Sequence, residues 1–251
     1  MPWRKTSDPY KILVSEMMLQ QTQVDRVVPK YKSFLKKFPT LKHLANAKQS
    51  AVVKEWQGLG YNRRALYLKR AAEHIVKNYG GRFPNNPIEL EKLPGVGPYT
   101  ARAVCTFAWN EPSVFIETNI RRVYIHFFFA RRKRVSDKEI IKVIQKTLPS
   151  HKAREWYWAL MDYGSSELKK IPNPNHKSVG YTRQSKFEGS QRYARAKMLK
   201  LILNEKRITL KRVRLEFKDD PLLHTYKPEE ILKALTQEGF IRKSGNIWCV
   251  V

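Results

Sequence analysis

The sequence predicts an all-α protein, and three observations support that prediction. Apolar residues recur at helical spacing almost from end to end, for example at Leu66, Ala71 and Ile75. The strict alternation typical of strands is nearly absent until the last dozen residues. Breaks rich in Pro, Gly and Asn divide the helical pattern at residues 38–40, 78–87, 110–112 and 171–175. We therefore expect roughly ten short helices before the C-terminal region.

The composition indicates which class of partner the protein binds, and it excludes several classes of protein. The 251 residues include 49 Lys and Arg against 22 Asp and Glu, a net charge of +27, which predicts a polyanionic partner, above all nucleic acid. The apolar and aromatic content excludes intrinsic disorder. No membrane span or secretory signal is recognisable, so we expect a cytoplasmic protein, nucleoid-associated if the source is prokaryotic. Two cysteines exclude a disulfide framework and a thiolate metal cluster, and we expect no metal.

The first helical segment carries a carboxyl group in apolar surroundings. Glu16 lies among Val14, Met17, Met18 and Leu19. Burial in such a setting favours the neutral form of a carboxylic acid. We therefore expect Glu16 to hold a proton near neutral pH.

A glycine-rich turn at residues 93–101 (LPGVGPYTA) predicts phosphate binding. A helix ends near Leu93, glycines allow a tight turn, and Pro98 suits the first position of the helix that follows. This turn resembles a helix-hairpin-helix motif, which binds a DNA phosphate without reading sequence. An ordinary helical hairpin with glycine caps is the alternative. The expected backbone-binding residues are Gly95, Val96, Gly97 and Thr100.

The C-terminal third is strongly basic and then changes pattern. Residues 165–215 hold 14 Lys and Arg against three Glu, with aromatics interleaved, so we expect a phosphate-tracking surface that includes Lys186; a solvated linker is the alternative. Residues 195–251 predict three helices at 198–203, 209–217 and 228–238. A hairpin at 241–251 follows, turning at Ser244-Gly245-Asn246. This order is that of a winged helix, which either binds DNA or docks on its own protein.

The N-terminal motifs resemble those of the MutY-type adenine DNA glycosylases. PWR at 2–4, DPY at 8–10 and SEMMLQQTQV at 15–24 carry the resemblance. Further matching segments keep their order up to residue 164: Gly58–Tyr61, Arg63–Ala65, Gly80-Gly81, Leu93–Thr100 and Met161–Gly164. The resemblance implies two helical modules flanking a DNA-binding cleft within a glycosylase domain at 1–194. One module spans residues 14–130 and the other spans 1–13 and 131–194, followed by the winged-helix-like unit at 195–251.

The resemblance also assigns catalytic roles. Glu16 matches the residue that protonates adenine at N7 and later helps to activate water; adenine needs this proton because its anion is a poor leaving group. Glu117, in FIETNIRRV at 115–123, takes the place of the family's catalytic Asp, which stabilises the oxocarbenium-like sugar. Thr118 replaces a glycine, and Asn119 is expected to orient the water or Glu16. We expect Glu16 and Glu117 to face each other. The extra methylene of Glu117 implies either a reshaped site or reduced activity.

Other matched positions imply contacts with the base and the duplex. Tyr99 stands where bifunctional relatives place a lysine nucleophile, which predicts hydrolysis without an efficient lyase step. Flipping a base leaves a gap that wedge residues fill. The expected pocket and wedge residues are Trp3, Arg4, Leu19, Gln21, Tyr61 and Tyr99.

Two family features have no counterpart in the sequence. Residues 164–248 contain no cysteine for the family's iron–sulfur cluster, so we expect no cofactor, with a monovalent cation at the hairpin left open. The expected substitutes for the cluster's DNA-binding loop are Lys169, Lys170, Lys177, Arg183, Lys186 and Arg192. Residues 195–251 do not resemble the family's 8-oxoguanine-sensing domain, so we expect a variant without it.

Together these observations predict a monomeric, monofunctional glycosylase of base excision repair. Its expected partner is double-stranded DNA with a mismatch or an oxidised base, from which it removes adenine opposite 8-oxoguanine or guanine. One alternative is a mismatch thymine or uracil glycosylase. The other is a DNA-binding protein without catalysis.

Overall fold

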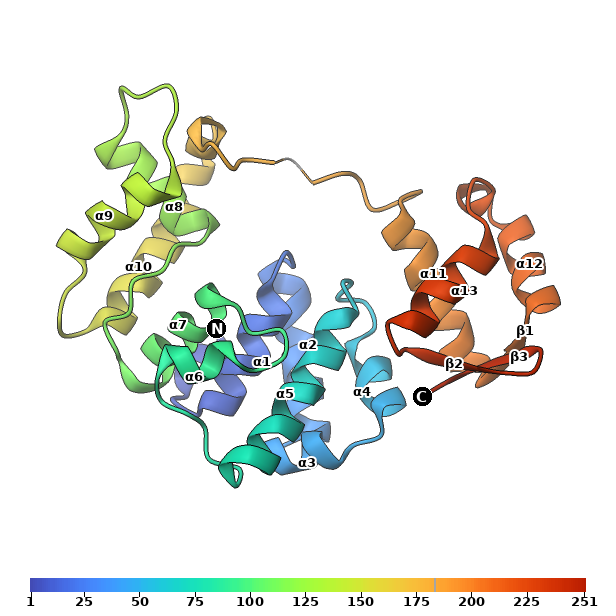
Figure 1. The fold of residues 1–251 in the computed structure, drawn as a ribbon. Coiled ribbons are helices and arrows are strands. Elements are labelled where there is room, and N and C mark those ends of the chain that lie inside the picture. Colours follow the sequence, from blue (N-terminus) through green and yellow to red (C-terminus); the bar gives the residue numbers. More distant parts are fainter. Residues whose placement is uncertain (183) are drawn as a thin grey trace. The chain divides into compact units, whose positions relative to one another are not determined.

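The computed structural model describes residues 1–182 and 184–251, and its contacts divide the chain into two compact units. Unit 1 comprises Met1–Glu16 and Phe83–Arg183, and unit 2 comprises Met17–Arg82 and Gln184–Val251. The all-α prediction is confirmed, because the regular structure of the described residues consists of helices apart from one small sheet (Figure 1). The predicted module boundaries at residues 14, 130 and 194 stay a prediction.

Unit 1 is built from short helices. They are η1 (Pro2–Lys5), most of α1 (Pro9–Leu19), α6 (Pro87–Glu91), α7 (Pro98–Trp109), α8 (Thr118–Phe128), α9 (Asp137–Thr147), α10 (Ala153–Ser165), η2 (Glu167–Lys169) and η3 (Pro174–Lys177). Helix α7 begins at Pro98, as predicted, and ends where Asn110 adopts the left-handed conformation. The break predicted at residues 110–112 therefore coincides with the C-terminal end of α7.

Helices α8 and α10 pack against each other in unit 1 (Figure 1). Their contact is close because Gly164 of α10 lies directly against the Asn119 backbone, where a Cβ atom on Gly164 would overlap the Asn119 carbonyl. Arg122 extends the contact by donating a 2.5 Å hydrogen bond to the Gly164 carbonyl. The glycine of the MDYG motif thus fixes the first turn of α8.

Unit 2 begins with the last turn of α1 and four further helices. These are α2 (Val24–Lys37), α3 (Leu41–Asn46), α4 (Gln49–Trp56) and α5 (Arg63–Tyr79). Helix α3 packs along α5, and α4 packs against both α2 and α5. Trp56 and Phe34 are fully buried, with ring centroids 6.0 Å apart in an edge-to-face arrangement. Thr40 caps α3, so the predicted break at 38–40 separates α2 from α3.

The rest of unit 2 is the C-terminal helical region with a three-stranded antiparallel sheet. Its elements are α11 (Gln191–Glu205), β1 (Arg207–Thr209), α12 (Leu210–Asp219), η4 (Pro221–Leu223), α13 (Pro228–Gln237), β2 (Ile241–Ser244) and β3 (Ile247–Val250), with strand order β1-β3-β2. The three predicted helices and the hairpin are present. Helix α11 begins earlier than expected, at Gln191, and strand β1 was not predicted. Three residues in a charged stretch are too few to show alternation.

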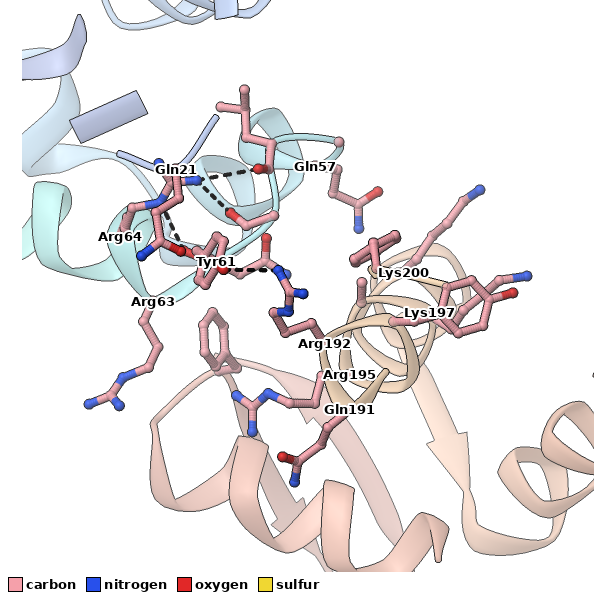
Figure 2. Close-up of a pocket in the computed structure, with 18 of the residues that line it drawn as sticks. Gln21, Gln57, Tyr61, Arg63, Arg64, Gln191, Arg192, Arg195, Lys197 and Lys200 are labelled. Atoms are coloured by element: carbon pink, nitrogen blue, oxygen red, sulfur yellow. Dashed lines mark hydrogen bonds between the residues drawn. The ribbon is translucent and has the colours of Figure 1, made fainter. Parts of the chain in front are cut away.

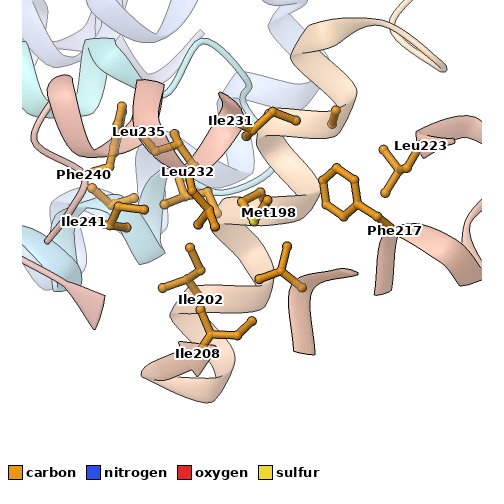
Figure 3. Close-up of a cluster of buried hydrophobic side chains, with 14 of the residues drawn as sticks. Met198, Ile202, Ile208, Phe217, Leu223, Ile231, Leu232, Leu235, Phe240 and Ile241 are labelled. Atoms are coloured by element: carbon orange, nitrogen blue, oxygen red, sulfur yellow. The ribbon is translucent and has the colours of Figure 1, made fainter. Parts of the chain in front are cut away.

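A buried apolar cluster holds the C-terminal region together (Figure 3). Met198 and Ile202 of α11 meet Phe217 of α12 and Leu232 of α13. The cluster also includes Val53 of α4 and Leu66 of α5. Gln49 adds a 2.7 Å hydrogen bond to the carbonyl of Gly239. The C-terminal region is therefore docked on the helices of its own unit, one of the two outcomes that the sequence left open.

Among residues 1–182 and 184–251, no helix is both long and apolar enough to cross a membrane.

Candidate active site

Glu16 is a buried carboxyl group whose pKa is raised toward neutral pH. It lies on α1 with 5% of its surface exposed. Its pKa is raised from 4.5 to about 7, and burial is the largest cause; the hydrogen bond from Tyr99 acts to lower the pKa, and the negative charge of Glu117 acts to raise it. The environment that the sequence predicted for Glu16 is therefore present, and it suits a general acid.

Tyr99 lies beside Glu16 at the start of α7. Its hydroxyl donates a 2.9 Å hydrogen bond to Oε2 of Glu16. Burial and the two carboxyl groups hold the pKa of Tyr99 well above its usual range, so the phenol stays neutral. Its ring meets Phe115 edge to face, and Phe115 stacks on Tyr157 with centroids 3.9 Å apart. This aromatic packing fixes the direction of the Tyr99 hydroxyl.

Glu117 is held at the N-terminus of α8. Its Oε1 accepts hydrogen bonds of 2.7 Å from the backbone N–H groups of Asn119 and Ile120, so the residue caps the helix. The Asn119 amide donates to Oε2 at 3.3 Å, so its hydrogen-bond partner is Glu117. Burial raises the pKa of Glu117, while the two backbone bonds and the nearby Arg121 and Arg122 lower it. Burial is the largest of these influences, so the pKa of Glu117 lies above its usual value of 4.5.

Thr118 occupies its position without backbone strain. It is the first residue of α8, and it is absent from the residues with positive φ. The glycine that the resemblance leads us to expect is therefore not required here. The extra methylene of Glu117 is accommodated by the cap, because the longer side chain folds back onto the N–H groups that follow it.

The hairpin joins α6 to α7 within unit 1. Gly95 has a φ of +76°, which a side chain would strain, and Gly97 is the N-cap of α7. Both glycines are exposed, whereas the side chains of Val96 and Thr100 are buried. The Val96 N–H bonds to the Leu93 carbonyl. The exposed part of the turn backbone therefore belongs to Gly95 and Gly97.

Trp3 and Arg4, the two N-terminal residues of the predicted pocket, lie in unit 1. Trp3 is buried in η1. Arg4 pairs with both carboxylate oxygens of Asp162 at 2.6 and 2.8 Å, and its guanidinium lies 5.4 Å from the Trp158 ring centroid. These contacts tie the PWR motif to the MDYG motif on α10.

The other predicted wedge residues lie in unit 2. Leu19 ends α1, and Gln21 follows with a φ of +54°. Tyr61 also has a positive φ, +45°, and 36% of its surface is exposed. Figure 2 shows Gln21 and Tyr61 lining the same pocket. Gln184 donates hydrogen bonds to both of them.

Arg64 is the residue whose role sequence reasoning missed. It is buried, and Nη1 donates to the carbonyls of Met17, Met18 and Gln20 at 2.6–2.9 Å. Its other nitrogens reach the carbonyls of residues 59–61. One guanidinium thus joins the loop that carries Gln21 to the loop that carries Tyr61. The only sequence signal was its place after the GLGY segment.

The residues present do not fit an iron–sulfur cluster. Such a cluster takes four cysteine ligands, whereas Cys105 and Cys249 belong to different units. In the described part of the chain, no group of three or more His, Cys, Asp or Glu is arranged to hold a metal ion. Of the predicted substitutes for the cluster loop, Lys186 is exposed in unit 2, and Arg183 lies outside the described residues.

Comparison with known proteins gives a family match over residues 14–150, described as "HhH-GPD superfamily base excision DNA repair protein". The adenine DNA glycosylase of Buchnera aphidicola is 36% identical over 169 residues. That match covers 66% of this chain and 47% of the relative, so the chain spans about half the length of that protein.

Two further relatives extend the comparison. The adenine DNA glycosylase of Mycolicibacterium smegmatis is 29% identical over 98% of this chain and 89% of its own length. The solved structure of a thermostable thymine-DNA glycosylase is 31% identical, with a TM-score of 0.62. The shared part covers 66% of this chain and 78% of that one.

Proposed function

The chain belongs to the HhH-GPD superfamily of base excision DNA repair proteins, and from this premise we propose that it is a monofunctional adenine DNA glycosylase. It binds double-stranded DNA as a monomer, flips an adenine that is mispaired with 8-oxoguanine or guanine, and hydrolyses its N-glycosidic bond. The named adenine glycosylases among its relatives and the net charge of +27 support this proposal.

The observation that carries the proposal is the buried carboxyl group of Glu16, which accepts a hydrogen bond from Tyr99. With a pKa of about 7, Glu16 can donate its proton at neutral pH. Transfer of this proton to adenine N7 lets the C1′–N9 bond break, with its electron pair moving to N9. Adenine then leaves as a neutral base, which avoids the unfavourable adenine anion.

In this reaction the carboxylate of Glu117 stabilises the positive charge that develops on the sugar. Loss of the base leaves positive charge on C1′ and the ring oxygen, which a nearby carboxylate stabilises. The α8 cap holds this carboxylate in place, since two backbone N–H groups bind its Oε1. Water adds to C1′, and its proton returns to the Glu16 carboxylate, which restores the acid.

The reaction ends at this hydrolysis, without strand cleavage. A lyase step needs an amine that attacks C1′ and forms a Schiff base. Tyr99 has no amine, and its hydroxyl is engaged with Glu16.

A second candidate is removal of thymine or uracil, which the likeness to a thymine-DNA glycosylase favours. Thymine and uracil leave as anions stabilised by two carbonyl groups, so they depend less on a proton donor. Glu16, with its raised pKa, is better suited to adenine. We therefore place adenine first.

A single-turnover assay on labelled duplexes tests the proposal. The duplexes hold adenine opposite 8-oxoguanine, guanine or thymine, together with a G·T and a uracil duplex, each analysed with and without alkali. We expect adenine release opposite 8-oxoguanine and guanine, with strand breaks only after alkali.

One variant and two further outcomes complete the test. Glu16→Gln should retain duplex binding and lose base release, since the amide has no proton to give. Release of thymine or uracil alone would favour the second candidate. Intact binding with no release from any duplex would favour a DNA-binding protein without catalysis.

A further inference from the structure

The short helix η3 packs on α8 within unit 1. Asn173 begins η3, and its Oδ1 accepts a 3.1 Å hydrogen bond from the Asn175 N–H group. Beyond η3, the Val135 N–H donates to the Lys177 carbonyl at 2.8 Å, and the Val135 carbonyl accepts from the Val179 N–H at 3.0 Å. The η3 segment is therefore tied to the chain that follows α8.

Asn175 is a buried side chain that reaches the first residue of α8. It is 2% exposed, and its Nδ2 donates a 3.0 Å hydrogen bond to the Thr118 carbonyl. Among residues 1–182 and 184–251, its Oδ1 has no hydrogen-bond partner. A buried acceptor without a partner destabilises a fold. The amide is therefore explained by what its N–H group holds, and not by a gain in stability.

The carbonyl that Asn175 binds belongs to the peptide unit between Thr118 and Asn119. The N–H group of the same unit donates a 2.7 Å hydrogen bond to Oε1 of Glu117. A peptide unit is planar, so its C=O and N–H groups turn together. Asn175 therefore fixes, from the opposite side, the direction of an N–H group that holds the Glu117 carboxylate. Hydrogen bonds in such a chain also polarise and strengthen one another.

We propose that Asn175 is a positioning residue for base release, which acts by orienting the Thr118–Asn119 peptide unit toward the Glu117 carboxylate. Without this hydrogen bond, the peptide unit and the carboxylate can rotate away from their aligned position. A displacement of about 1 Å in a catalytic group lowers a rate on the order of 100-fold. The inference rests on the proposed function, because it assigns Asn175 a part in that reaction.

The first test measures the peptide unit itself, in the free protein and without DNA. Asn175→Leu has a similar volume, no N–H donor and no unpaired oxygen. Asn175→Asp is the second variant, nearly identical in shape and also without an N–H donor. In both variants the backbone amide of Asn119 should exchange with solvent about tenfold faster, as measured by NMR, while the amides of α9 exchange as in the natural protein.

The second test is the single-turnover assay. Both variants should release adenine on the order of 100-fold more slowly, with little change in duplex Kd. The alkaline limb of the rate should move to lower pH, because a displaced Glu117 charge raises the Glu16 pKa less. Both variants leave in place the titratable and charged groups that interact with Glu117, which are Glu16, Tyr99, Arg121 and Arg122.

Asn110→Gly is the matched control in unit 1. The Asn110 Oδ1 accepts a 2.9 Å hydrogen bond from the Arg154 N–H at the start of α10, and glycine tolerates its φ of +61°. This variant loses a side-chain brace on another helix, and it should keep the natural Asn119 exchange, rate and alkaline limb.

Unchanged Asn119 exchange in both Asn175 variants would overturn the inference. So would faster exchange with an unchanged rate, or an equal loss of rate in Asn110→Gly. Absence of adenine release by the natural protein would reject the proposed function, while the exchange measurement would still show whether Asn175 orients the peptide unit.

Discussion

The Tyr99 hydroxyl donates a 2.9 Å hydrogen bond to the Glu16 carboxyl group, joining the start of α7 to α1 within unit 1. The bond lowers the Glu16 pKa, in opposition to burial, which raises it. The resulting value of about 7 lets the residue give and take a proton at neutral pH. Tyr99 therefore tunes the acid while its ring lies against Phe115.

The pH dependence of base release should depend on this bond. In the proposed reaction Glu16 acts in its protonated form, so the single-turnover rate should fall as pH rises through about 7. In Tyr99→Phe the influence that lowers the pKa is lost, and the alkaline limb should move to higher pH. Tyr226→Phe, which loses a tyrosine hydrogen bond to the Gly189 carbonyl in unit 2, should leave the limb in place. An unmoved limb in Tyr99→Phe would contradict the assigned tuning.

Glu16→Gln should stabilise the protein at alkaline pH. The folded-state pKa of Glu16 lies above its ordinary value of 4.5, so the folded state binds more protons than the unfolded state between pH 4.5 and about 7. Stability from this group is full at low pH and is lost as pH rises through this window. The neutral amide avoids that loss, which reaches about 3 kcal/mol above pH 7.

Urea unfolding at pH 4 and pH 8 measures this difference. The free energy of unfolding of Glu16→Gln, relative to the natural protein, should be larger at pH 8 than at pH 4. An equal difference at both values would mean that Glu16 is not buried as described.

The local parts of this site were predictable from the sequence. Glu16 stands among apolar neighbours on one helix, so its burial follows from helical periodicity. The α6–α7 hairpin was also predictable, since Gly95 and Pro98 encode the turn and the helix start. In both cases residues close in sequence determine the structure.

Contacts between distant segments were not predictable in this way. Arg192 meets Tyr61 across 131 positions of sequence, and Arg64 reaches carbonyls 44–47 residues away. Nothing in the local pattern around an arginine tells which backbone carbonyl or ring it will meet. The cap that Glu117 makes on α8 was also missed, although its partners, Asn119 and Ile120, are close to it in sequence.

Replacing Glu117 should separate its charge from its capping role. In Glu117→Gln the side-chain oxygen can still accept from the Asn119 and Ile120 N–H groups, but the negative charge is gone. The single-turnover rate should fall on the order of 100-fold. The Glu16 pKa should also fall, because the charge that raises it is removed, so the alkaline limb moves to lower pH.

A cap on another helix of unit 1 gives the control. Ser136→Ala removes the capping box of α9 and should cost about 1 kcal/mol of stability without changing the rate. A rate loss in Ser136→Ala as large as that in Glu117→Gln would show that helix stability, and not charge, limits catalysis.

Gly164→Ala should displace α8, the helix that Glu117 caps. The added Cβ would overlap the Asn119 carbonyl, so α8 or α10 must shift. We expect a loss of about 1–3 kcal/mol in the free energy of unfolding. A displacement of about 1 Å at Asn119 and Glu117 would lower the rate on the order of 100-fold. Gly180→Ala, whose Cβ meets no atom within 4 Å, should unfold like the natural protein. Equal stability of the two variants would argue against the tight contact.

Gly97→Ala should weaken DNA binding without weakening the fold. Gly97 has an ordinary φ of −93°, and an added Cβ meets nothing within 4 Å, so the free energy of unfolding should change by less than about 0.5 kcal/mol. If the hairpin backbone approaches a phosphate closely, the methyl group keeps that phosphate away, and duplex affinity should fall about tenfold. Asn86→Ala provides the opposite control, since it removes the cap of α6 and should cost about 1 kcal/mol of stability with little effect on affinity. Unchanged affinity in Gly97→Ala would mean that the exposed hairpin does not hold the DNA backbone.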